Sequence, residues 1–183
     1  MSNMHRRVPL LLILALTAHA PADAESALSP ASLASSSVEA GLPIADRVVV
    51  RKAERKLYLM SKGAVLRAYK VALGLRPDGH KQMEGDYRTP EGTYRLSRRN
   101  PNSEFFLSIQ ISYPNEDDVA RARRLGASPG GAIMIHGQPN VPRKTRDYYT
   151  NVDWTEGCIA LSNSDMVEIW LMTPPDTPIE IQP

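Results

Sequence analysis

The chain contains a single cysteine, Cys158, so no disulfide bond can form within it. Any fold must therefore depend on a hydrophobic core and on backbone hydrogen bonds. Residues 46–183 have the length of one domain, which is enough to bury such a core without covalent cross-links. The sequence thus predicts one folded domain in this region.

Residues 1–24 have the pattern of a secretory signal peptide. Basic residues at positions 5–7 precede an apolar run from Val8 to Ala18. This run is shorter than the ~20 residues that a membrane-spanning helix needs. The small residues of Ala22-Asp23-Ala24 offer a cleavage site before Glu25. The pattern predicts export from the cytoplasm, and a retained membrane anchor is the alternative.

The composition of the remaining chain excludes several classes of function. Residues 25–45 are rich in Ala, Ser and Pro without periodicity, which predicts a flexible tether. The formal net charge of +2 is too small to indicate a nucleic-acid partner, and no basic stripe with interleaved aromatic residues occurs. Beyond residue 24 the histidines are His80 and His136 alone, without metal-ligand spacing. We therefore expect neither a metal nor a cofactor.

The hydrophobic pattern of the domain predicts mainly β structure. Ser61-Lys62-Gly63 is a turn, and the runs on either side of residues 51–55 suggest a hairpin. The predicted strands cover residues 48–50, 56–60, 65–73, 105–112, 132–135 and 179–181, with a further strand starting near Thr93.

Two helices are also predicted. The first covers Glu116 to Leu125 and is ended by Gly126. The second starts near Ser162, with an acidic residue at the spacing of a capping box, and Pro174 stops it. Its core-facing side is predicted to comprise Met166, Ile169 and Trp170. The basic residues Arg143, Lys144 and Arg146 are expected to lie in a solvated loop.

The cysteine and one histidine form the candidate site. Cys158 directly follows Gly157, and His136 lies upstream at the end of an apolar run. An unpaired cysteine in an exported chain is usually functional, and a thiol with a histidine within folding reach indicates a nucleophile and its base. Two alternatives stay open: Cys158 as a small buried hydrophobe, and His136 as a hydrogen-bonded core residue. His80 lies in the glycine- and charge-rich stretch Gly79-His80-Lys81, which predicts a solvated loop.

Three segments in order, 85–94, 135–137 and 155–163, resemble the L,D-transpeptidase (YkuD-type) catalytic domain. The resemblance extends over about Val48 to Ile181. It implies a β-sandwich of mixed sheets with a short helix after the nucleophile. It also implies a periplasmic enzyme that acts on peptidoglycan stem peptides, forms a thioester on its cysteine and passes the acyl group to an amine.

The chain departs from the commonest family signature at two positions. Glu156 stands where many members have histidine, and Ala160 where many have arginine. The form Asp-Trp-Thr-x-Gly-Cys resembles a branch that includes both transpeptidases and enzymes that release outer-membrane lipoprotein from peptidoglycan. The resemblance therefore implies a transferase that forms cross-links or attaches lipoprotein, or a hydrolase that cleaves such bonds. A non-catalytic wall-binding module is a third reading.

The resemblance also assigns roles to individual residues. It makes Cys158 the nucleophile and His136 the base, with the carbonyl of Gly137 holding the other ring nitrogen. The backbone amides of Gly157 and Cys158 are the expected oxyanion donors. A carboxylate facing the thiol would raise the thiol pKa. Glu156 therefore either points away from the thiol and pairs with a cation, or binds an amine of the substrate. We expect the second of these roles. The residues expected to contact the substrate are Gly137, Thr155 and Glu156.

Overall fold

The computed structural model describes residues 41–183. The predicted signal peptide and most of the predicted tether lie outside these residues. Ala45, at the end of the predicted tether, is buried, and its N–H donates a hydrogen bond to the carbonyl oxygen of Met172. In this part of the chain eight strands form a mixed sheet in the order β3-β2-β1-β8-β4-β5-β6-β7.

One half of the sheet is built from both ends of the domain. The strands β1 (Arg47–Arg51), β2 (Lys56–Ser61) and β3 (Ala64–Lys70) are antiparallel neighbours, and the first two form the predicted hairpin. The last strand, β8 (Pro178–Gln182), pairs in parallel with β1. The central position of β1 explains why Val48, Val49 and Val50 are all buried.

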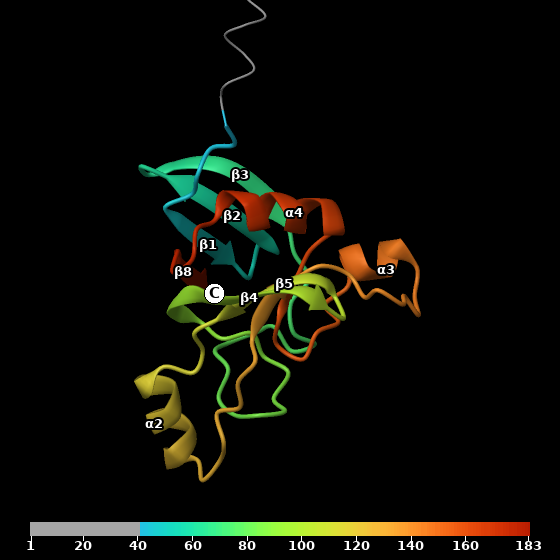
Figure 1. The fold of residues 1–183 in the computed structure, drawn as a ribbon. Coiled ribbons are helices and arrows are strands. Elements are labelled where there is room, and N and C mark those ends of the chain that lie inside the picture. The colour runs from blue at the N-terminus through green and yellow to red at the C-terminus, as the bar shows by residue number, and fades with distance from the viewer. Residues whose placement is uncertain (1–40) are drawn as a thin grey trace, which may run out of the picture. The chain divides into compact units, whose positions relative to one another are not determined.

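The other half carries the candidate site. The long strand β4 (Gly92–Ser103) pairs with β8 near its start and with β5 (Phe106–Ile111) further along, so it belongs to both halves. The strands β6 (Met134–His136) and β7 (Ile159–Ala160) complete the sheet, and β7 was not predicted. Figure 1 shows the two halves joined through β8 and β4. The expectation of a mainly β fold with mixed strand pairing is confirmed.

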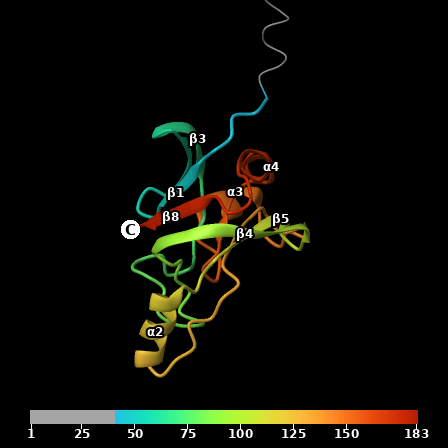
Figure 2. The same ribbon diagram turned by 60° about the vertical axis from the view of Figure 1, so that its left-hand side comes forward.

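Both predicted helices are present. The helix α2 (Glu116–Arg124) starts with a capping box between Asn115 and Asp118. The helix α4 (Asn163–Met172) starts at Ser162, whose hydroxyl accepts a hydrogen bond from the Asp165 N–H. Figure 2 shows α4 end-on above β5, and α2 at the opposite end of the domain. The α4 side chains that enter the core are Met166, Ile169 and Met172.

A third helix corrects the sequence analysis. The segment predicted to be a solvated loop leads into α3 (Arg146–Asn151), which is capped by the Thr145 hydroxyl. The helix is anchored by Tyr149, whose buried ring packs edge-on against Trp154 at a centroid distance of 5.1 Å. A helix of six residues depends on such tertiary contacts rather than on its own propensity. None of the helices between residues 41 and 183 is long and apolar enough to cross a membrane.

Candidate active site

Two short parallel strands bring the candidate histidine and cysteine to the same face of the sheet. Ile135 of β6 lies opposite Ile159 of β7, and both side chains are fully buried in the core. Side chains alternate between the two faces of a strand. The residues beside these isoleucines, Met134, His136 and Cys158, therefore face away from the isoleucines and toward a cavity.

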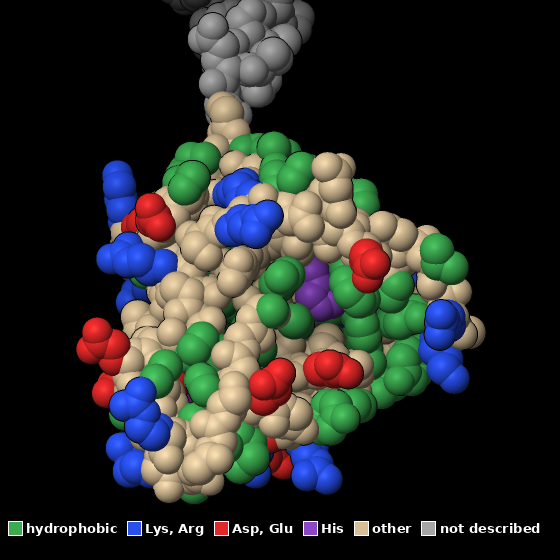
Figure 3. All heavy atoms as spheres, turned by 60° about the horizontal axis from the view of Figure 1, so that its bottom comes forward, with side chains coloured by type: hydrophobic (Ala, Val, Ile, Leu, Met, Phe, Trp, Pro, Cys, Tyr) green, Lys and Arg blue, Asp and Glu red, His purple; other side chains and the backbone are tan. Residues whose placement is uncertain are grey.

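His136 and Cys158 both line this cavity, which has a volume of about 400 Å³. Figure 3 shows a histidine at the floor of a hollow, with hydrophobic and acidic side chains around it. The structure thus brings together the two residues that the sequence analysis paired. Other residues that line the cavity are Phe105, Met134, Trp154, Thr155 and Glu156.

The imidazole of His136 is held by its backbone neighbour and by two aromatic rings. Its Nδ1 lies 2.7 Å from the carbonyl oxygen of Gly137, the contact that the resemblance implied. Its ring centroid lies 4.6 Å from that of Phe105 and 5.6 Å from that of Trp154. Burial lowers the pKa of His136 to about 4, so the ring is neutral at pH 7. With the Nδ1 proton donated to Gly137, the Nε2 lone pair is free to accept a proton.

Gly137 is packed too tightly to carry a side chain. A Cβ atom there would lie 2.6 Å from Oδ1 of Asn163 and 3.0 Å from the carbonyl oxygen of Phe105. Its N–H donates to the carbonyl oxygens of Phe105 and Leu107, and its own carbonyl oxygen receives His136. The backbone groups of Gly137 therefore orient the histidine.

The turn before Cys158 is anchored by Asp153, for which the sequence analysis had no role. Its Oδ1 accepts a hydrogen bond from the Leu73 N–H at 2.9 Å, and its Oδ2 forms an ion pair with Arg55 at 3.0 Å. A bridge between Gly74 and Thr155 continues this attachment. The only sequence signal for it was that Asp153 opens the Asp-Trp-Thr-x-Gly-Cys motif.

The hydroxyl of Thr155 holds the turn itself together. It accepts a hydrogen bond from the Gly157 N–H at 3.1 Å and donates one to the carbonyl oxygen of Cys158 at 2.8 Å. Of the two expected oxyanion donors, the Gly157 N–H is therefore already engaged. Within residues 41–183 no hydrogen bond engages the backbone N–H of Cys158. We therefore expect this N–H to be the donor that remains for an oxyanion.

Gly157 offers a test of how tightly the nucleophile is positioned. Its φ of +130° is unfavourable for other residues, and a Cβ atom would lie 2.7 Å from the carbonyl oxygen of Arg88. We expect Gly157→Ala to lower the free energy of unfolding by at least ~1–3 kcal/mol, the cost of such strain alone, as measured by urea denaturation. The matched control is Gly63→Ala, since Gly63 has a φ of +82° but open space around it. Equal losses in the two variants would contradict the close packing at Gly157.

The environment of Cys158 keeps its thiol protonated in the unliganded protein. Burial raises the pKa of the Cys158 thiol, and the carboxylate of Glu156 raises it further. The backbone N–H of Met134 and the ammonium of Lys81 act in the opposite direction, and the net effect is a raised pKa. The sulfur lies 3.7 Å from the carbonyl oxygen of Ala132. The resting site thus pairs a neutral thiol with a neutral imidazole.

A second cavity of about 220 Å³ also reaches Cys158. The two cavities share three lining residues, Ala132, Glu156 and Cys158. The exposed carboxylate of Glu156 takes part in no ion pair in the described part of the chain. The side chains of Lys81 and Glu84 line the second cavity as well.

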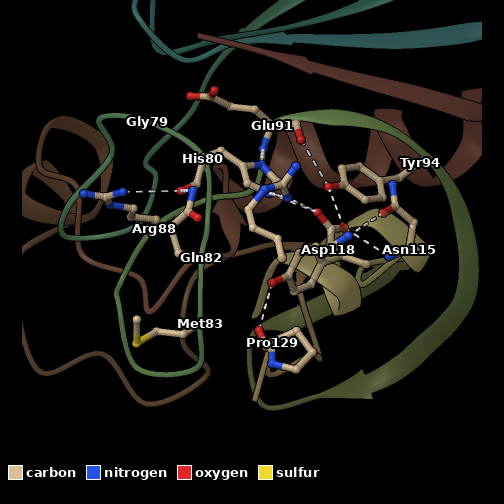
Figure 4. Close-up of polar contacts among 12 residues, drawn as sticks. Gly79, His80, Gln82, Met83, Arg88, Glu91, Tyr94, Asn115, Asp118 and Pro129 are labelled. Carbon is tan, nitrogen blue, oxygen red and sulfur yellow. Dashed lines mark hydrogen bonds and ion pairs between the residues drawn. The ribbon is translucent and has the colours of Figure 1, made fainter. Parts of the chain in front are cut away.

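The stretch Gly79-His80-Lys81 is not a solvated loop, which corrects the prediction. The Lys81 side chain is buried, and Figure 4 shows His80 enclosed by polar groups from several segments. The His80 Nδ1 accepts a hydrogen bond from the Glu91 N–H, and its Nε2 lies 2.9 Å from Oδ1 of Asp118 at the start of α2. His80 lines neither of the two cavities. Its contacts fasten the loop to α2, and the sequence around it gave no signal for partners so far away.

Comparison with known proteins agrees with this geometry. The family model of the L,D-transpeptidase catalytic domain (YkuD) matches residues 45–181. YafK of Escherichia coli (strain K12), whose name places it among the L,D-transpeptidases, is 30% identical over 129 residues, which are 67% of this chain and 45% of that protein. The helical cell shape determining protein Pgp2 from Campylobacter jejuni has a crystal structure with a TM-score of 0.56 and 27% identity, over 74% of this chain and 46% of that one.

The structure of Bd1075 from Bdellovibrio bacteriovorus matches with a TM-score of 0.51 and 25% identity, over 76% of this chain and 51% of that one. The chain therefore spans about half the length of these relatives. The family match, in contrast, extends over almost all of the described residues. This chain belongs to the L,D-transpeptidase catalytic domain family.

Proposed function

We propose that this chain is a periplasmic L,D-transpeptidase that forms a thioester between Cys158 and a peptidoglycan stem peptide. The observation that carries the proposal is the position of Cys158, which lines two cavities. A transferase must hold an acyl donor and then an acceptor at the same thiol. The two cavities that Cys158 lines can serve these two needs. Export rests on the sequence of residues 1–24 alone.

The acylation step begins with a protonated thiol on Cys158 and a neutral imidazole on His136. As the sulfur attacks the carbonyl carbon that precedes the terminal D-alanine of the stem peptide, Nε2 of His136 takes the thiol proton. The carbonyl oxygen becomes an oxyanion, which the Cys158 N–H stabilises. The intermediate then collapses, the C–N bond breaks, and His136 returns the proton to the departing amine. The products are a thioester on Cys158 and free D-alanine.

An amine resolves the thioester by the reverse sequence. The neutral amine attacks the thioester carbonyl, His136 accepts its proton, and the thiol is released in its protonated form. The acceptor amine belongs to a second stem peptide in a cross-link, or to an outer-membrane lipoprotein in an attachment reaction. Because Pgp2 is a cell shape determining protein, we infer an effect on cell shape through the wall.

Mass spectrometry of defined muropeptides, with and without an added amine acceptor, tests this function. A transpeptidase should give a cross-linked or amine-exchanged product that grows with acceptor concentration. Water as the sole acceptor, even at high amine concentration, would instead show that the chain is a hydrolase using the same thioester. The absence of any covalent intermediate would contradict the proposal and favour a wall-binding module.

We expect Glu156 to recognise a cationic amine rather than to activate the thiol. Its carboxylate raises the pKa of Cys158, which opposes activation. A hydrogen bond to a charged group contributes roughly 1.5–3 kcal/mol. Glu156→Gln should therefore reduce turnover of amine-bearing peptides by about one to two orders of magnitude at low substrate concentration.

Alkylation of Cys158 by a small neutral reagent serves as the comparison for this variant. It should be unchanged or slightly faster in Glu156→Gln, since a negative charge near the thiol is removed. An exposed acidic residue outside both cavities, Asp117 in α2, provides the matched control variant Asp117→Asn. A collapse of alkylation with retained substrate binding would place Glu156 in the activation machinery and contradict its role in recognition.

A further inference from the structure

The smaller cavity contains charges of both signs beside the nucleophile. Lys81 supplies a positive charge, and Glu84 and Glu156 supply negative charges. The volume of about 220 Å³ lies below the roughly 300–1,000 Å³ of pockets that hold drug-sized ligands. A cavity of this size and charge fits a small group with both an ammonium and a carboxylate.

The ammonium of Lys81 is fixed in place by its own loop. Its Nζ donates to Oδ1 of Asp86 at 2.8 Å and to the carbonyl oxygen of Met83 at 3.1 Å. Oδ2 of Asp86 in turn accepts the Gln82 N–H at 2.6 Å, so the loop closes around the carboxylate. A lysine ammonium has three donors, and these two contacts are its hydrogen bonds within residues 41–183. One donor thus remains for a ligand.

What distinguishes Lys81 from the other buried lysine, Lys52, is its place at the wall of a cavity that Cys158 also lines. The Lys81 side chain is 4% exposed, although burying an ammonium is costly. Both buried lysines have a carboxylate partner: Lys81 is ion-paired with Asp86 at 2.8 Å, and Lys52 with Glu91 at 2.7 Å. Lys52 lines neither cavity at Cys158, whereas Lys81 is at the wall of one. A fixed and poorly solvated positive charge beside a nucleophile is suited to binding an anionic group of the substrate.

We propose that Lys81 is a specificity-determining residue that binds the carboxylate on the carbon next to the reacting nitrogen. The inference rests on the proposed function and names the group that the smaller cavity recognises. A departing D-alanine carries this carboxylate, and so does an incoming acceptor amine that belongs to an amino-acid centre. The departing and the incoming amine must occupy the same place, because the two half-reactions are the reverse of each other. Glu156, at the same cavity, then faces the amine of the incoming group.

A competition between two acyl donors tests this inference. The donors are a stem tetrapeptide that ends in D-alanine and the same peptide ending in D-alaninamide, mixed in equal amounts. The ratio of the two rates of consumption does not depend on the fraction of enzyme that is folded. We expect wild type to prefer the free carboxylate and Lys81→Gln to lower that preference about 10- to 100-fold, the range for a hydrogen bond to a charged group.

The matched control is Lys52→Gln, which removes a buried ammonium that bonds the carbonyl oxygens of Gly79 and Thr89 in the same loop region but does not line the cavity. It should keep the wild-type ratio. An equal loss of preference in Lys52→Gln would show that the effect comes from a loosened loop and would overturn the inference. An unchanged ratio of the two consumption rates in Lys81→Gln would also overturn the inference, whether or not alkylation of the thiol is slowed. Consumption of neither donor by wild type would instead contradict the proposed function itself.

Discussion

Replacing Cys158 with alanine should abolish covalent labelling by a tetrapeptide muropeptide or by a carbapenem. Wild type should gain the mass of the acyl group, and the variant none, as measured by mass spectrometry of the intact protein. Turnover should fall on the order of 10⁶-fold, since the covalent nucleophile of an acyl transfer is removed. Cys158 lines both cavities, and its thiol can form a thioester.

Cys158→Ser is a second variant that keeps the size of the side chain. It should bind substrate as wild type does, and it should not be labelled, because a hydroxyl is a far weaker nucleophile at neutral pH than a thiol. Both variants should retain the thermal stability of wild type within a few degrees. Acyl labelling of Cys158→Ala at the wild-type level would remove Cys158 from the mechanism.

Replacing His136 with glutamine should slow acylation of Cys158 by about 10²- to 10⁴-fold, the usual contribution of a general base. The glutamine amide can still donate to the Gly137 carbonyl, but it cannot accept the thiol proton. Because the thiol of Cys158 is protonated in the resting state, it needs a base in this step, and the neutral imidazole of His136 can accept its proton. Stopped-flow or quenched measurements of acylation at pH 7 provide the rate.

His80→Gln is the matched control, because His80 lies outside both cavities. Its acylation rate should stay within a few-fold of wild type for the folded protein. Equal rates in His136→Gln and wild type would show that the thiol ionises without help from this imidazole.

The pKa of His136 also predicts a pH dependence. Since burial lowers the pKa of His136 to about 4, the base remains active well below the ordinary histidine value of about 6.5. Acylation should therefore be lost only as the pH falls through about 4.

The unfolded chain takes up a proton on this histidine below about 6.5. The free energy of unfolding should thus fall by roughly 3 kcal/mol between pH 6.5 and 4, and His136→Gln should lack this decrease.

The sequence by itself predicted the class of fold, which the structure confirms, and the candidate pair Cys158 and His136, which the structure places at one cavity. Short β-type runs marked most of the strands, Gly126 marked the end of the first of the two longer helices, and Ser162 and Pro174 marked the limits of the second. These signals are local, because strand alternation and helix caps involve residues a few positions apart. The pairing of Cys158 with His136 also needed only their residue types and the lone thiol.

The tertiary structure alone decided how the site is built around this pair. The strand β7 has two residues and exists because β6 and the segment near Ala72 pair with it. The burial of Lys81, the polar contacts of His80 and the engagement of the Gly157 N–H each required the three-dimensional arrangement. Lys81 reaches Cys158 through a cavity whose walls come from segments about 50 and 75 positions away in the chain. Contacts over such separations leave no periodic pattern in a single sequence, so the charge beside the nucleophile became visible only in the folded domain.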